Sequence, residues 1–159
     1  PAFSYGLNVA VSYKNFDLSM FWQGVADQDI YNNQKFQTDF WSITDAGSNK
    51  GNRMLNAWTS DNTDSSIPAL TTNNTADEGR VSTYYVENGS YLKLRTLQLG
   101  YNVPEKFISK LKMSSLRAYI SGQNLLTLKS SSLTCSDPEN PSWAYPLATS
   151  ISFGLQVGF

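Results

Sequence analysis

The chain has 159 residues, a formal net charge of −1 and only 16% charged residues, and it contains one cysteine and no histidine. The lack of histidine excludes a Ser-His-Asp triad and histidine-based zinc sites within this sequence, and a single cysteine excludes an internal disulfide. Because the net charge is close to zero and no basic run occurs, the composition disfavours nucleic-acid binding through electrostatics.

Apolar and polar residues alternate at the start of the chain. Every second residue from Tyr5 to Tyr13 is apolar, and the alternation resumes at Phe16. A period of two predicts β-strands with one apolar and one polar face. We therefore expect strands at about 3–14 and 16–25, joined by a tight turn at about 14–16.

The next segment, about 25–89, loses this periodicity and is rich in Asn, Asp, Ser, Thr and Gly. We interpret it as a long loop, with a short helix expected at 52–58. A connection of this length argues against a compact soluble domain unless the loop is functional or folds on itself.

Alternation returns over about 90–103, although the apolar phase changes between Leu94 and Leu97, which predicts a β-bulge near Arg95. Pro104 ends this strand, because proline cannot donate a ladder hydrogen bond. A short turn with helical spacing is expected at about 104–115, followed by a strand at about 116–129.

A medium loop at about 130–146 precedes a last strand at about 147–159, which alternates up to Phe159. Short and long connections therefore alternate, which is typical of membrane β-barrels with short periplasmic turns and long extracellular loops. No apolar run reaches the roughly 20 residues of a spanning helix. The pattern predicts an all-β fold with about five antiparallel transmembrane strands, the two long loops outside, and the two short turns and Phe159 on the periplasmic side.

Five strands cannot close a barrel, and an open edge in lipid leaves backbone groups unpaired. The chain also starts at Pro1, with neither Met nor a signal segment. We therefore expect residues 1–159 to be the C-terminal segment of a longer protein that supplies the other strands.

Residues 88–104 read NGSYLKLRTLQLGYNVP, and residues 116–127 read LRAYISGQNLLT. Asp137-Pro138-Glu139, Tyr145-Pro146 and the ending from Phe153 to Phe159 follow in order. This series resembles the C-terminal part of the SusC/RagA family of TonB-linked outer-membrane transporters. The first hairpin resembles the preceding strands of that family, and the resemblance is weakest over 27–80.

The resemblance implies a 22-stranded barrel in the bacterial outer membrane, closed by an N-terminal plug that lies outside this chain. It implies uptake of oligosaccharides or peptides with energy from the TonB complex, and a SusD-like surface lipoprotein as a lid. It implies neither a cofactor nor an enzymatic activity. The alternative that we keep is a secreted or surface β-sandwich that binds carbohydrate through loop aromatics.

Three tryptophans, Trp41, Trp58 and Trp143, fall in the loops expected outside. Their rings can stack on sugars or contact a lid protein, or they can pack within their own loops. Phe159 is the candidate barrel-assembly signal that the resemblance implies, and the other interpretation is the end of an ordinary edge strand.

No pair of acids has the spacing needed for catalysis or calcium binding, so we expect no catalytic, cofactor or metal site. The pairs Asp61 and Asp64, and Asp137 and Glu139, are interpreted as solvated loop acids, with Asp137-Pro138 as the start of a turn. A further group of polar residues is expected to face the barrel lumen and to contact the plug or line a substrate path. This group contains Lys93 or Arg95, Arg117, Gln123 and Gln156.

Overall fold

The structure is a computed structural model, and it describes residues 1–40, 49–72, 77, 80–142 and 145–159. The chain divides into two compact units. The sheet unit contains residues 1–28, 89–130 and 147–159, and the loop unit contains residues 29–88 and 131–146. Within the described ranges, no helix has the length and apolarity needed to cross a membrane.

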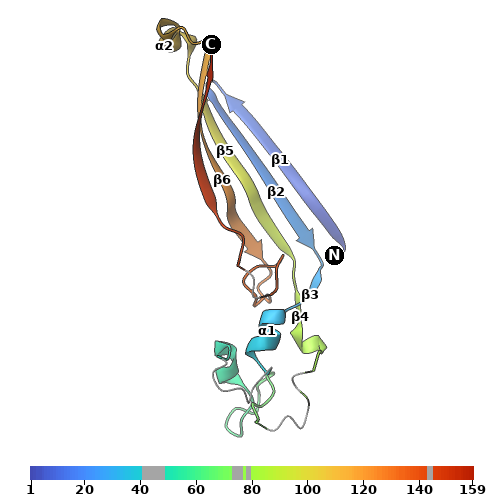
Figure 1. Cartoon of the computed structure of the whole chain (residues 1–159). Helices are drawn as coiled ribbons and strands as arrows, with labels where there is room; N and C mark the ends of the chain where they lie inside the picture. The colour runs from blue at the N-terminus through green and yellow to red at the C-terminus, as the bar shows by residue number, and fades with distance from the viewer. Residues whose placement is uncertain (41–48, 73–76, 78–79, 143–144) are drawn as a thin grey trace. The chain divides into compact units, whose positions relative to one another are not determined.

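The sheet unit is one antiparallel sheet of five strands in the order β1-β2-β5-β6-β7 (Figure 1). The strands are β1 (Phe3–Tyr13), β2 (Phe16–Ala26), β5 (Tyr91–Asn102), β6 (Ser115–Lys129) and β7 (Ser150–Gly158). The all-β antiparallel prediction agrees with this sheet. The last strand starts at Ser150 and not at 147, because residues before Ser150 make no ladder with β6 beyond Gln123.

The register places nearly all apolar side chains on one face of the sheet, which we call the apolar face. Val11 lies opposite Leu18, Leu18 opposite Leu99, and Leu99 opposite Ile120. Directly paired residues point to the same side, so the alternation in each strand adds up across the whole sheet. The opposite side, the polar face, collects the Ser, Asn, Gln, Asp, Lys and Arg residues of the strands.

The phase change in β5 is a bulge, as predicted. Opposite β2, the pairing moves from Phe21 with Thr96 to Trp22 with Leu94, which leaves Arg95 as the extra residue. The pairing of β5 with β6 is irregular at the same place. The bulge keeps Leu94 and Leu97 on the apolar face, although their positions differ by three, an odd number that would place them on opposite faces of a regular strand.

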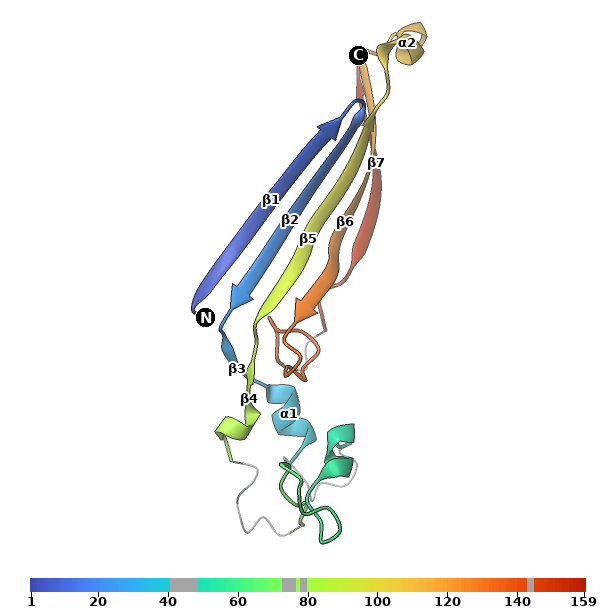
Figure 2. The ribbon, with the colours of Figure 1, turned by 180° about the vertical axis from the view of Figure 1, so that it is seen from behind.

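The two short connections and the C-terminal residue lie at one end of the sheet, which we call the hairpin end (Figures 1 and 2). One connection is the turn at Lys14, whose φ is 52°. The other contains helix α2 (Glu105–Ile108) and the 3-10 helix η3 (Ser109–Leu111). The structure thus has a short helical turn in the predicted 104–115 connection.

The loop unit contains far more regular structure than the sequence indicated. It has the strand pair β3 (Asp29–Tyr31) and β4 (Val86–Asn88), helix α1 (Asn33–Thr38), and 3-10 helices η1 (Asn52–Asn56) and η2 (Thr83–Tyr85). The helix η1 lies where a short helix was expected. The segment interpreted as an unstructured loop therefore folds on itself over much of its described length.

Two small hydrophobic cores hold the loop unit together. The first contains Phe40, Met54, Ala57 and the fully buried Tyr85. Aromatic rings from α1 and η2 pack around it, and the ring centroids of Phe36 and Tyr85 lie 5.1 Å apart in an edge-to-face arrangement. The second core joins Ile30 to Leu133 and Cys135, so it brings the two long connections of the chain together.

Candidate functional site

A buried polar network in the loop unit centres on Glu87 of β4, whose residue is 7% exposed. Its carboxylate accepts hydrogen bonds from the Asn32 side chain at 2.8 Å and from the Thr134 backbone N–H at 2.9 Å. The Thr134 hydroxyl donates to it at 2.9 Å, and Lys35 Nζ lies 3.4 Å from Oε1. Burial raises the pKa of Glu87, but the bonds from Thr134 and Asn32 and the Lys35 charge outweigh it, so the pKa is lowered overall.

Asn32 connects this network to the start of α1. Its side-chain oxygen caps the helix by accepting from the Lys35 backbone N–H at 2.9 Å, while its amide nitrogen donates to Glu87 and Thr134. Asn32 is fully buried. One side chain therefore satisfies a helix terminus and two partners from distant parts of the sequence.

A second network lies at the other end of α1. Asp39 is fully buried and accepts from Arg53 Nε at 2.7 Å and from the Tyr84 hydroxyl at 2.9 Å. Burial, followed by the negative charge of Asp39, raises the pKa of Tyr84. Lys35 Nζ lies 4.0 Å from the centroid of the Tyr84 ring and donates to the Tyr84 carbonyl, which links the two networks.

These contacts make the loop unit a defined platform. Residues 29–88 and 131–146 come from different connections, yet partly buried hydrogen bonds from Asn32 and Glu87 to Thr134 join them. No periodic pattern in the sequence points to these residues, because their contacts join positions far apart in the chain. Only Asn32, a residue type favoured at helix N-termini, carried a local signal.

The predicted site tryptophans are only partly described. Trp58 follows η1 and is 44% exposed, and its backbone N–H donates to the Ile67 carbonyl at 2.9 Å. Its ring is thus available at the surface of the loop unit. Trp41 and Trp143 lie outside the described residues, so their prediction is not tested.

The loop acids differ from one another in their exposure to solvent. Asp137 is 6% exposed, so the expectation of a solvated acid is wrong for it. Its carboxylate accepts the Glu139 backbone N–H at 2.9 Å and starts a turn, as the Asp137-Pro138 pair predicted. Asp61 and Asp64 are exposed. Among the described residues, no group of three or more Cys, Asp or Glu side chains could hold a metal ion.

On the polar face, Arg117 forms the most connected side-chain cluster. Its guanidinium binds the Asp17 carboxylate twice, with Nε to Oδ2 at 3.0 Å and Nη2 to Oδ1 at 2.5 Å. The pair reaches from β6 to β2 across Gly100 of β5, where a Cβ atom would meet both side chains. Nη1 donates to Gln156 of β7 at 3.3 Å. Asn102 of β5 also donates to the Asp17 carboxylate at 3.3 Å, so the cluster ties four strands together near the hairpin end.

The other residues expected to face a lumen also lie on the polar face. Gln123 pairs with Thr96 and Ser150, and Lys93 pairs with Gln23 and Thr127, all through polar-face positions. Arg95, at the bulge, donates to the Gln23 side chain at 2.8 Å. The face assignment made from alternation thus agrees with the register, whereas contacts to a plug are not tested.

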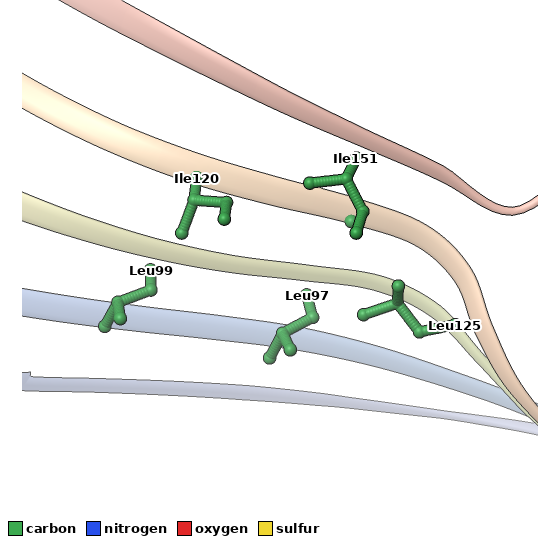
Figure 3. A pocket seen from close by; sticks show the side chains of 6 residues that line it. Leu97, Leu99, Ile120, Leu125 and Ile151 are labelled. Atoms are coloured by element: carbon green, nitrogen blue, oxygen red, sulfur yellow. The ribbon is translucent and has the colours of Figure 1, made fainter.

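The apolar face is exposed to an extent unusual for a water-soluble domain. Phe153 is 81% exposed and Leu155 is 71% exposed. Leu97, Leu99, Ile120, Leu125 and Ile151 surround a shallow apolar hollow of about 180 Å³ over Gly122 (Figure 3). An uncovered apolar surface of this kind is expected where lipid, and not water, is the solvent.

Comparisons with known proteins agree with a sheet that forms part of a membrane protein. No protein-family model matches the chain. The chain is 37% identical over 130 residues to TonB-dependent receptor P3 of Formosa agariphila, which covers 80% of this chain and 12% of that protein. It is 28% identical over 177 aligned positions to TonB-dependent receptor P26 of the same organism, which covers the whole chain and 17% of that protein.

Solved structures give the same result in three dimensions. The RagAB peptide transporter matches with a TM-score of 0.75 and 26% identity, over 97% of this chain and 17% of that chain. The RagAB peptide importer in the open-open state matches with a TM-score of 0.78 and 26% identity, over 98% and 17% of the two chains. The chain belongs to the SusC/RagA-like TonB-dependent receptors.

Because the chain belongs to this family, the sheet, with one apolar and one polar face, is part of the β-barrel of a receptor. The chain spans less than a fifth of the length of the receptors it matches. The relatives are transporters and receptors, not enzymes, which agrees with the prediction that the chain belongs to no enzyme. A β-sandwich would cover the apolar face with a second sheet, so the exposed apolar face and these relatives together argue against the carbohydrate-binding sandwich.

Proposed function

We propose that the full-length protein imports an oligosaccharide or a peptide across the outer membrane, with energy supplied through the TonB complex. The observation that carries this proposal is the match of nearly the whole chain to TonB-dependent receptors and to RagAB peptide transporter structures. The exposed apolar face supports placement of the sheet in a membrane. The remaining barrel and the plug would come from the rest of the protein.

The proposal includes a SusD-like surface lipoprotein as the lid. The loop unit supports a lid partner, because the two long connections fold together into one unit instead of forming two independent loops. In the proposed topology this platform lies outside the cell, where a lid and a ligand would meet it. A preorganised surface loses less conformational entropy on binding than a disordered one.

The test is to purify the full-length receptor from outer membranes in detergent and to identify the proteins and small molecules that copurify. The proposal predicts a surface lipoprotein and a bound oligosaccharide or peptide, both detectable by mass spectrometry. Uptake of the labelled ligand should stop when TonB is deleted. A receptor that fractionates away from outer membranes, or uptake that continues without TonB, would contradict the proposal.

Within this function we propose Trp58 as a contact for the ligand or the lid. It is the described member of the three candidate tryptophans and is half-exposed. Trp58→Ala should weaken binding of the copurified ligand or lipoprotein, since stacking contacts of this type are worth about 1 kcal/mol. Val81→Ala, at another exposed apolar residue of the loop unit, is the control. Trp41 and Trp143 are proposed for the same role.

We also propose that Phe159 is the signal for the barrel-assembly machinery. The residue is 92% exposed and follows directly after β7, which lies at an edge of the described sheet. Deleting Phe159 should reduce the amount of folded receptor in the outer membrane, whereas Ser152→Thr, at a polar-face position of β7, should not. The proposal requires Phe159 to end the mature protein, which mass spectrometry of its C-terminal peptide would check.

A further inference from the structure

Four lysines gather at the hairpin end of the sheet unit. Lys14 lies in the turn between β1 and β2, and Lys106, Lys110 and Lys112 lie in the connection between β5 and β6. All four are exposed. The hairpin end is therefore basic, although the chain as a whole carries a net charge of −1.

Few carboxylates oppose these lysines. Glu105 is exposed in the first turn of α2. Asp17 lies near the same end of the sheet, but the Arg117 guanidinium engages both of its oxygens on the polar face. Phe159 also lies at this end of the sheet (Figure 1), so the carboxylate of a protein that ends there, as proposed above, adds one negative charge. The four lysines still outnumber Glu105 and that carboxylate, so net positive charge is available to an outside partner.

The connection that carries three of the lysines is amphipathic. Ile108 is 2% exposed and fixes α2, whereas the neighbouring Phe107 ring is 61% exposed. Lys106 Nζ lies 4.9 Å from the centroid of that ring. Lys112 ends the segment in the left-handed conformation, with φ 55°. A short element with outward lysines around an exposed aromatic ring resembles the interfacial anchors of membrane proteins.

An aromatic band on the apolar face adjoins this basic connection. Phe16 and Tyr101 pack with ring centroids 4.8 Å apart, and Tyr13 next to them is 67% exposed, with Lys14 Nζ 5.2 Å from its centroid. Aromatic rings of this kind mark the level of the membrane–water interface in outer-membrane barrels. The lysines then lie just beyond that level, at the depth of lipid headgroups.

We propose that the hairpin end binds the phosphate groups of anionic phospholipids in the leaflet that it meets, with Lys106, Lys110 and Lys112 as the main contacts. This inference rests on the outer-membrane placement proposed above, but not on import or on the substrate. A lipid fits the surface better than free phosphate does, because the exposed Phe107 ring and the aromatic band offer apolar contact beside the charge. Each lysine near a charged membrane surface contributes about fivefold to binding.

The test uses the full-length receptor in detergent, with dioleoyl phosphatidylglycerol and dioleoyl phosphatidylcholine added at equal concentration. Native mass spectrometry counts the lipids that stay bound. The wild-type receptor should prefer phosphatidylglycerol, and the preference should fall as salt rises, because exposed charges are screened. In the triple variant Lys106→Gln, Lys110→Gln, Lys112→Gln, the ratio of bound phosphatidylglycerol to bound phosphatidylcholine should fall at least about tenfold.

The matched control replaces the same three lysines with arginine, which keeps the charge and should keep the preference. Phe107→Ser should weaken retention of both lipids.

Excess glycerol 3-phosphate should not displace the bound lipid. Displacement by it would show that the lysines form a simple anion site and not a lipid-binding surface. An unchanged preference in the glutamine variant, or a wild-type preference that salt does not affect, would also overturn the inference. A receptor that never reaches outer membranes would instead contradict the proposed function.

Discussion

At the scale of single residues, the sequence selects Arg117 as a polar-face side chain but does not identify its partners. Arg117 was expected on the polar face, but its partner Asp17 is 100 positions away, and the connection depends on Gly100 leaving room between them. Gln98 joins the cluster when its amide oxygen faces Arg117, at 2.8 Å from Nη2. A planar guanidinium suits such a multiple contact better than an ammonium does.

The first prediction concerns this pair. Arg117→Gln should lower the unfolding temperature of the receptor, because Asp17 loses both guanidinium bonds. Unfolding is followed as the change in mobility of the heated protein on a gel. Arg117→Lys should be intermediate, since an ammonium cannot reproduce the bidentate geometry. The double variant with Asp17→Asn should unfold at a higher temperature than Arg117→Gln alone. Equal unfolding temperatures for all variants would show that the pair does not hold the sheet.

The second prediction concerns Glu87. Glu87→Gln replaces a buried carboxylate that accepts from Asn32 and Thr134, and charged hydrogen bonds of this kind contribute about 2 kcal/mol each. We expect faster hydrogen exchange in residues 29–38 and 131–140 of the full-length receptor, without a change in the sheet strands. Asp64→Asn, at an exposed acid of the same unit, should leave exchange unchanged.

The pH dependence of the loop unit follows from the same carboxylate. The pKa of Glu87 is lowered in the folded state, so its contribution is present above the ordinary glutamate pKa and is lost as pH falls through the lowered value. Exchange or protease cleavage in the loop unit should therefore rise on acidification. In Glu87→Gln this acid-induced increase should be smaller, and an identical pH profile in both proteins would contradict the assignment.

At the scale of elements, the sequence predicted the sheet well, because a strand with one face in lipid must alternate. The change of apolar phase between Leu94 and Leu97 predicted the bulge, which keeps both side chains on the apolar face. It could not predict the loop unit, whose contacts join Asn32 to Thr134 across 102 positions without any period. It also could not explain Phe21 on the polar face, whose ring packs over Gly6 of the neighbouring strand.

The third prediction tests the bulge. Deleting Arg95 removes the extra residue of β5, so either Leu94 or Leu97 must turn to the polar face. We expect the full-length receptor to lose its folded gel mobility and its place in the outer membrane. Arg95→Ser keeps the backbone length and should assemble, although the hydrogen bond to Gln23 is lost. Normal assembly of the deletion variant would show that the register can adjust elsewhere.

At the scale of the whole molecule, the two faces of the sheet experience different solvents. On the apolar face, a continuous row of directly paired apolar residues crosses all five strands. It contains Val11, Leu18, Leu99, Ile120 and Phe153. The polar face carries the Arg117 cluster and the lysine and glutamine residues. Both outer strands, β1 and β7, have one unpaired edge in the described sheet, which a barrel wall must pair with further strands.

The last prediction uses two adjacent residues of β7 that point to opposite faces. Phe153 pairs with Ile120 on the apolar face, and Ser152 pairs with Ser121 on the polar face. A lysine on the lipid side near the middle of a strand costs about 2–4 kcal/mol, whereas one facing an aqueous lumen costs little. Phe153→Lys should therefore reduce folding of the full-length receptor into lipid vesicles, measured by gel mobility, and Ser152→Lys should fold like the wild type. The opposite order would mean that the lipid meets the polar face, and equal folding of both variants would mean that neither face meets lipid at this depth.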